Sequence, residues 1–137
     1  MRVVIKGLSQ TIAGLERAKA RTLEAAGSGL YAEGHKIMGA SAREVPIDTG
    51  ALLGSGLVNR PQPGLGSIAV ELGYGYGDET NPKTGQPVTG YAIYVHERTG
   101  PRHKSPRKAK FLEDPAKAAE AGFATRIGAF IRARLGV

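Results

Sequence analysis

Apolar residues recur every three or four positions along the first third of the chain, which is the period of an amphipathic helix. The stripe begins after Ser9, a plausible helix cap, and consists of Ile12, Leu15, Leu23, Ala26, Leu30 and Ile37. We therefore expect a long helix from about Gln10 to Arg43, interrupted or weakened at Gly27-Ser28-Gly29. Pro46 prevents its continuation, because proline pushes the preceding residue out of the helical region.

Alternation with a period of two predicts strands in the middle of the chain. In residues 67–74, SIAVELGY, apolar side chains alternate as in a half-buried strand. Residues 91–97, YAIYVHE, predict a second strong strand that is apolar on both faces up to His96 and Glu97. Shorter strands are expected in RVVIKGL at the N-terminus and in GLVNR at residues 56–60, and PQPG at residues 61–64 predicts a turn.

The remaining segments predict a helical turn, two loops and a last helix. TGALLGS at residues 49–55 favours one helical turn. Residues 75–90 form a long polar loop without periodicity, and residues 98–110 form a basic loop. Near the C-terminus, Asp114 is suited to cap a helix with Pro115 at its first position. The apolar face of that helix is Ala119, Phe123, Ile127, Phe130 and Ile131.

This order of elements predicts one α+β domain over residues 1–137. A small antiparallel sheet of about three strands is packed by the long N-terminal helix and the C-terminal helix. A chain of 137 residues is long enough for one core, although aromatic residues make up only 6% of it.

The formal charge of +7 is expected to draw the protein to polyanions. The chain has no cysteine, which excludes disulfides, thiolate chemistry and cysteine-based zinc sites and fits a reducing compartment. Its N-terminus has too few consecutive apolar residues for a signal peptide, and no run approaches the length of a membrane span. A soluble protein made in the cytoplasm is expected.

Asp48 lies in VPIDTGALLGS, and an Asp-Thr-Gly run is how aspartic proteases present a catalytic carboxylate. A protease would need a second carboxylate from a dimer and an all-β framework, whereas a long helix is expected just before Pro46. The alternative, which we favour, is that Asp48 or Thr49 caps the following helical turn.

The other candidates for catalysis or metal binding are weaker. His96, Glu97 and His103 have the spacing H-E-x5-H, which does not place two imidazoles on one helical face. Neither Ser55 nor Ser67 has a nearby histidine or a nucleophile elbow. Glycines at residues 73–77 do not have the spacing of a dinucleotide-binding loop. We therefore expect no enzyme activity, metal or cofactor.

Six basic residues without an intervening acid form the basic loop: Arg98, Arg102, Lys104, Arg107, Lys108 and Lys110. Such a run is either a solvated surface or a contact for phosphates or an acidic protein. Because the run has no aromatic residue, sequence-specific recognition of single strands is not favoured.

Three segments, in this order and at this separation, resemble the tail-completion (head–tail joining) proteins of long-tailed bacteriophages, also known as minor capsid or minor tail proteins. They are VPIDTGAL at residues 45–52, YAIYVHE at 91–97 and FLEDPA at 111–116. The motif residues are Pro46, Asp48, Thr49, Gly50, Leu52, Tyr91, Ala92, Tyr94, Val95, His96, Phe111, Leu112 and Pro115. The loop at residues 75–90 has no counterpart that we can match.

The resemblance implies a structural protein of the virion neck, assembled in the bacterial cytoplasm. It implies a fold similar to tail terminators and a ring, commonly a hexamer, between the head connector, or stopper, and the tail tube, with duplex DNA passing through the bore. In isolation we expect a monomer or weak oligomer in which residues 75–90 and 100–108 are mobile. The alternatives are a small basic protein that binds nucleic acid without sequence preference and, more remotely, the dimeric aspartic protease.

Overall fold

The structure is a computed structural model that describes residues 2–4 and 8–137. Its helices are α1 (Leu8–Glu44), α2 (Ala51–Gly54), α3 (Val88–Glu97), α4 (Glu113–Glu120) and α5 (Phe123–Leu135), and its strands are β1 (Leu57–Val58), β2 (Gln62–Pro63), β3 (Ile68–Ala69) and β4 (Leu72–Gly73). The expected α+β class is confirmed: a long N-terminal helix, a small antiparallel sheet and a C-terminal helix pack against one another.

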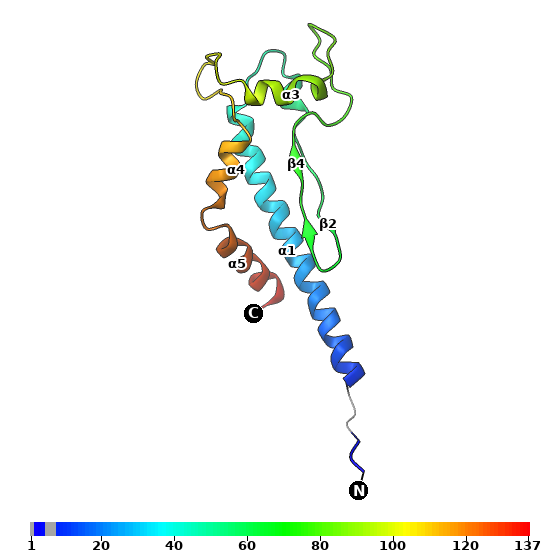
Figure 1. Ribbon diagram of the computed structural model, residues 1–137. Helices are drawn as coiled ribbons and strands as arrows, with labels where there is room; N and C mark the ends of the chain where they lie inside the picture. The colour runs from blue at the N-terminus through cyan, green and yellow to red at the C-terminus, as the bar shows by residue number, and fades with distance from the viewer. Residues whose placement is uncertain (1, 5–7) are drawn as a thin grey trace.

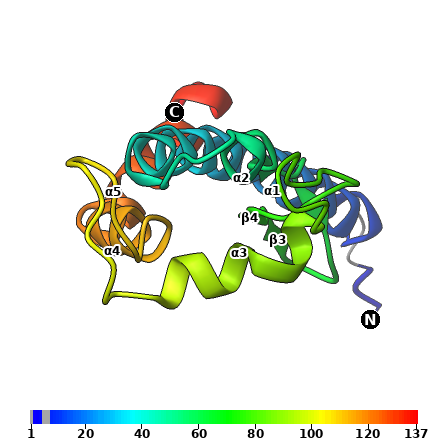
Figure 2. The same cartoon turned by 90° about the horizontal axis from the view of Figure 1, so that it is seen from above.

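Helix α1 is the axis of the molecule (Figure 1). The strands lie along one side of it and α4 and α5 lie along the other, so that three layers are formed. Helix α3 crosses near the C-terminal end of α1 and connects the strand side with the α4 side (Figure 2). The N-terminal part of α1 projects beyond the other elements (Figure 1), and residues 15–22 are exposed.

Helix α1 continues through Gly27-Ser28-Gly29, so the expected interruption there is wrong. Gly29 in this segment and Gly34 further along the helix lie where neighbouring elements approach α1 closely. A Cβ atom on Gly29 would lie 3.2 Å from the Phe130 ring, and one on Gly34 would lie 2.9 Å from Cγ1 of Val58. The lower helix propensity of glycine is thus offset by contacts that a larger residue would not allow.

The N-terminal end of α1 also differs from expectation. Helix α1 begins at Leu8, so Ser9 lies inside it and does not precede it as a cap. Of the opening strand expected in RVVIKGL, residues 2–4 have no regular structure, and residues 5–7 lie outside the described residues.

The strands form one long hairpin between residues 57 and 73, in place of three separate strands. Leu57 pairs with Gly73, whereas Pro63 pairs with Ile68, so the register shifts by one residue between the two strand pairs. Prolines lack the N–H that a continuous ladder needs, which explains why the pairing is interrupted around Pro61. The expected turn at residues 61–64 lies further along, closed by the bond from Gly64 N–H to the Ser67 carbonyl at 2.9 Å.

The face of the hairpin was predicted correctly. Ile68, Val70 and Leu72 are partly buried, whereas Ala69 and Glu71 are exposed. The expected strand at residues 67–74 is nevertheless divided into β3 and β4.

The strand expected at residues 91–97 is wrong, because this segment belongs to α3. Val88 is 1% exposed, and Tyr91, Ala92 and Val95 pack against the same core, whereas Ile93 is 73% exposed. These positions follow the i, i+3, i+4, i+7 pattern of a helix. The β-branched and aromatic composition favoured a strand, but the periodicity from Val88 onward favours the helix that is observed. The polar loop consequently ends at Pro87, not at Gly90.

The expected C-terminal helix is divided in two at Ala121 and Gly122. Gly122 has a φ of 70°, a left-handed conformation that glycine adopts without strain. Helix α4 begins at Glu113, so Asp114 lies in the first turn and its side chain does not cap the helix. Pro115, also in the first turn, is buried.

The core is small and lies where α2, α3 and the start of α4 meet the end of α1. Its buried members are Val45, Leu52, Val88 and Phe111. The edges of the Tyr74 and His96 rings approach Phe111, with centroids at 5.2 Å and 5.0 Å. Within the described part of the chain, no helix is both long and apolar enough to cross a bilayer.

Candidate functional site

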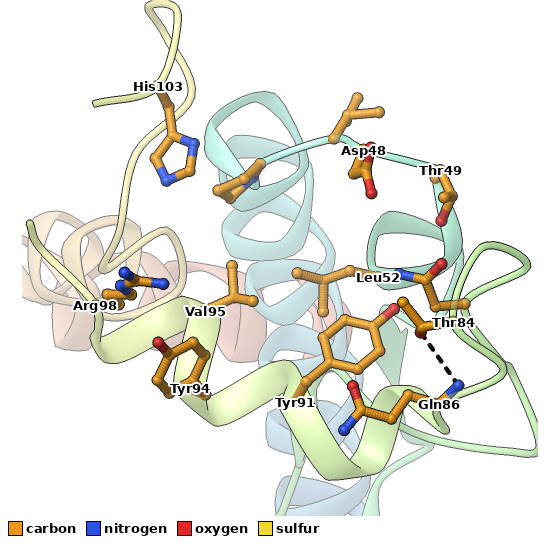
Figure 3. Close-up of a pocket in the computed structure, with 14 residues that line it drawn as sticks. Asp48, Thr49, Leu52, Thr84, Gln86, Tyr91, Tyr94, Val95, Arg98 and His103 are labelled. Atoms are coloured by element: carbon orange, nitrogen blue, oxygen red, sulfur yellow. Dashed lines mark hydrogen bonds between the residues drawn. The ribbon is translucent and has the colours of Figure 1, made fainter. Parts of the chain in front are cut away.

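A groove of about 620 Å³ lies beside the Asp48 loop and brings this loop together with the polar loop and α3, which follow much later in the sequence (Figure 3). Residues 46–50 and Leu52 form one wall, Asn81, Thr84 and Gln86 of the polar loop form the second, and α3 forms the third. His103 of the basic loop lies at one end. The groove therefore contains parts of two sequence motifs and of both loops.

Asp48 lies on the wall of this groove in an exposed ion pair. Its carboxylate accepts a hydrogen bond from the Lys83 ammonium, and its side chain is 66% exposed. The N-cap position of α2 is Gly50, which makes no side-chain capping bond, so neither Asp48 nor Thr49 is the N-cap residue. Thr49 Oγ1, one position earlier, accepts the N–H of Ala51 at 3.4 Å. The Asp48 carboxylate thus faces a cation, whereas an aspartic protease needs a second carboxylate that shares a proton.

Helix α3 lines the groove with Tyr91, Tyr94 and Val95, and Arg98 at its C-cap lines it as well. Burial raises the pKa of the Tyr91 hydroxyl, and the Asp48 carboxylate adds to this increase. Tyr91 therefore remains a protonated hydrogen-bond donor at neutral pH. The Arg98 guanidinium lies over the Tyr94 ring, with Cζ 5.3 Å from the centroid. An apolar floor with a few polar and charged groups is the usual composition of a ligand-binding groove.

His96 lies outside the groove, on the opposite side of α3, and connects α3 to α4. Its Nε2 accepts the backbone N–H of Glu113 at 3.3 Å, so the ring proton is on Nδ1, which donates to Glu97 at 2.7 Å. His103 is not near it, so the H-E-x5-H residues do not form one site.

His96, Glu97 and Glu113 nevertheless bring three potential ligand atoms within 4.8 Å of one another. The Lys110 ammonium pairs with both carboxylates, at 2.9 Å for Glu113, and so supplies the positive charge that a metal would bring. Lys117 and Lys110 lower the pKa of Glu113 to about 2. The cluster is thus a charge-balanced joint between α3 and α4.

Several bases of the basic loop, which were expected to contact a partner, instead bind other parts of the chain. The Arg107 guanidinium donates to the carbonyls of Ala42 and Val45 at 2.8 Å and 3.0 Å, where α1 ends. Lys108 pairs with Asp114 at 2.6 Å and with Glu44 at 3.5 Å. Arg107, Lys108 and Lys110 thus fasten the loop to α1, α3 and α4.

Arg98, Arg102 and Lys104 are exposed. In the described part of the chain these three bases form no salt bridge.

Both serines considered as nucleophiles have structural surroundings. Ser55 is buried; its hydroxyl donates to the Leu52 carbonyl at 2.7 Å and accepts the N–H of Gly75 at 3.0 Å. Ser67 lies in the exposed turn of the hairpin.

One buried ion pair was not predicted from the sequence. Glu33 is 5% exposed, and its carboxylate accepts two bonds from the Arg126 guanidinium, at 3.0 Å and 2.9 Å. Arg126 also donates to the carbonyls of Ala119 and Ala121, where α4 ends. One sign of this ion pair was present in the sequence, because Glu33 is a charged residue within the apolar part of α1. The sequence did not identify the partner, which lies 93 residues away.

No protein-family model, curated protein or solved structure matches this chain.

Proposed function

We propose that this protein is a structural subunit of a bacteriophage neck, which joins the DNA-filled head to the tail. It forms a ring between the connector and the tail tube, and DNA passes through the ring. The proposal assigns no catalytic residue and no cofactor.

The observation that carries the proposal is the position of the three segments that resemble head–tail joining proteins. Residues 45–52, 91–97 and 111–116 are distant in the sequence, yet they meet in one core around Val45, Leu52 and Phe111. Their order and spacing therefore correspond to a packing requirement of this fold. This supports the resemblance to the extent that the three segments form one packing unit in the fold.

The surface area supports the assembly part of the proposal. The chain exposes 9391 Å². A compact monomer of 14.4 kDa is expected to expose about 6,800 Å². A subunit of a ring contributes about 800 Å² to each of two standard interfaces, and the excess of about 2,500 Å² is large enough for both. Exposed apolar residues such as Leu15, Ile93 and Tyr94 are available for such contacts.

The test is electron microscopy of a lysate from a phage or prophage in which this gene is disrupted, with the gene supplied in trans as the control. We expect DNA-filled heads beside free, finished tails, and restoration of joined particles by the intact gene. Tails of uncontrolled length would make the protein a tail terminator instead. Intact, infectious particles without the gene product would refute a role in the neck.

A further inference from the structure

We propose that duplex DNA contacts this protein along the projecting part of α1 and the adjacent end of α5, and not along the basic loop. This inference rests on the proposed function, since a neck ring surrounds the DNA. The contact residues, which we call the α1 basic end, are Arg17, Arg21, Arg132 and Arg134.

The two helices bring these bases to the same end of the molecule. Helix α5 runs antiparallel to α1, and its Phe130 and Ile127 pack against Gly29 (Figure 1). The C-terminal turn of α5, with Arg132 and Arg134, therefore lies further toward the N-terminal half of α1. Lys19 lies on the other side, where its Nζ would be 3.5 Å from a Cβ on Gly66 in the hairpin turn.

The charge at this end is not balanced within the chain. All four bases are exposed, and none of them forms a salt bridge within the described residues. Glu16 and Glu24 are the acidic residues of this part of α1. In the basic loop, by contrast, Lys108 and Lys110 are paired with carboxylates, Arg107 donates to backbone carbonyls and Arg98 lies over the Tyr94 ring. Arg102 and Lys104 are the exposed bases of the loop that have none of these contacts within the described residues. Unpaired bases give a stronger field for a polyanion than bases that already face carboxylates.

The shape and composition of the α1 basic end favour duplex DNA over other partners. Residues 13–24 extend about 18 Å at 1.5 Å per residue, a length along which a duplex presents about ten phosphate charges. The segment has no aromatic residue that could stack on the bases of a single strand. Leu15 is the large apolar residue that this segment exposes strongly. Its apolar surface is too small for a helix that lies in a membrane surface.

The test compares two double variants that remove the same charge. Arg17→Ala with Arg21→Ala changes the α1 basic end, and Arg102→Ala with Lys104→Ala changes the exposed part of the basic loop. Alanine is the best helix former, so the first variant should keep α1 intact, and circular dichroism would verify this. Binding of each full chain to a fluorescent duplex of mixed sequence is measured by anisotropy between about 50 and 200 mM salt.

For the wild-type chain we expect affinity to fall linearly on a plot of log K against log salt. Loss of two phosphate contacts should reduce the slope by about 1.8 in the α1 variant, because each contact contributes about 0.9. The loop variant should keep the wild-type slope. An unchanged slope in the α1 variant, a reduced slope in the loop variant, or no salt-dependent binding by the wild-type chain would overturn the inference.

These outcomes are separate from the test of the proposed function. Free tails and filled heads in the gene disruption, together with absent DNA binding, would leave the neck role and remove this inference. DNA binding that depends on Arg17 and Arg21, together with normal particles in the disruption, would instead leave a DNA-binding protein without a neck role.

Discussion

Replacing Gly34 by alanine is expected to destabilise this protein, although alanine is the better helix former. A Cβ atom at this position would lie 2.9 Å from Cγ1 of Val58 and 3.4 Å from Cγ1 of Val70. Val58 is 6% exposed and its β-branched side chain has little rotamer freedom, so it cannot move away cheaply. Gly39 lies in the same helix, and a Cβ atom there would have no neighbour within 4 Å, so this glycine serves as the matched control.

The two substitutions should change the free energy of unfolding in opposite directions. Glycine to alanine in a helix without steric conflict adds about 0.5 to 1 kcal/mol, which we expect for Gly39→Ala. Overpacking a close contact costs about 1 to 3 kcal/mol, so Gly34→Ala should lose about 1 kcal/mol net. For a chain of 137 residues, 1 kcal/mol corresponds to about 3 to 4 °C in Tm.

Differential scanning calorimetry of both variants would measure these shifts. We expect Tm to rise by about 3 °C in Gly39→Ala and to fall by a similar amount in Gly34→Ala. Adding Val58→Ala should reduce the cost of Gly34→Ala, since it removes the methyl group in conflict. If both alanine variants raise Tm equally, the close contact between α1 and the hairpin is wrong.

The core, one ion pair and the loops each lead to a further prediction. Phe111→Ala should cost about 3 to 5 kcal/mol in chemical denaturation, whereas Ile93→Ala should stay within about 0.5 kcal/mol; equal effects would contradict the assignment of the core. The Arg126 guanidinium holds the pKa of Glu33 below its ordinary value of 4.5, so the stability from this pair is present above that pH and is lost as pH falls through the lower, folded-state pKa. Below pH 4.5 the Tm of the wild type should therefore fall more steeply than that of Glu33→Gln. Parallel curves of Tm against pH would refute the contribution of this ion pair to stability. Amide exchange in the free protein should be fast at residues 77–86 and 99–106 and slow in α3, and protection of both loops would count against their ordering on assembly.

Periodicity in the sequence predicted the parts of the fold that depend on a single element. The helix over residues 10–43 was recognised because a long apolar stripe leaves few alternatives. The exposed and buried faces of residues 68–72 were also correct, since the period of two fixes which side chains share a face.

The segment at residues 91–97 shows where local patterns fail. Tyr91, Ile93 and Val95 favour a strand by residue type, but Val88, Tyr91 and Val95 are placed on one side only by a helix. The choice between the two depends on whether a core exists to cover that side. Here Val45, Leu52 and Phe111 supply it, and they come from three other parts of the chain.

The sequence by itself determined the α+β class, the long first helix and the net positive charge. Only the tertiary structure decided which charges are paired: Lys110 pairs with Glu97 and Glu113, whereas Arg17 and Arg21 form no salt bridge among the described residues. It also decided that Gly29 is a packing contact and not a break in the helix. The physical reason is that helix periodicity is set within a few residues along the chain, whereas ion pairs and close contacts depend on which distant segments the fold brings together.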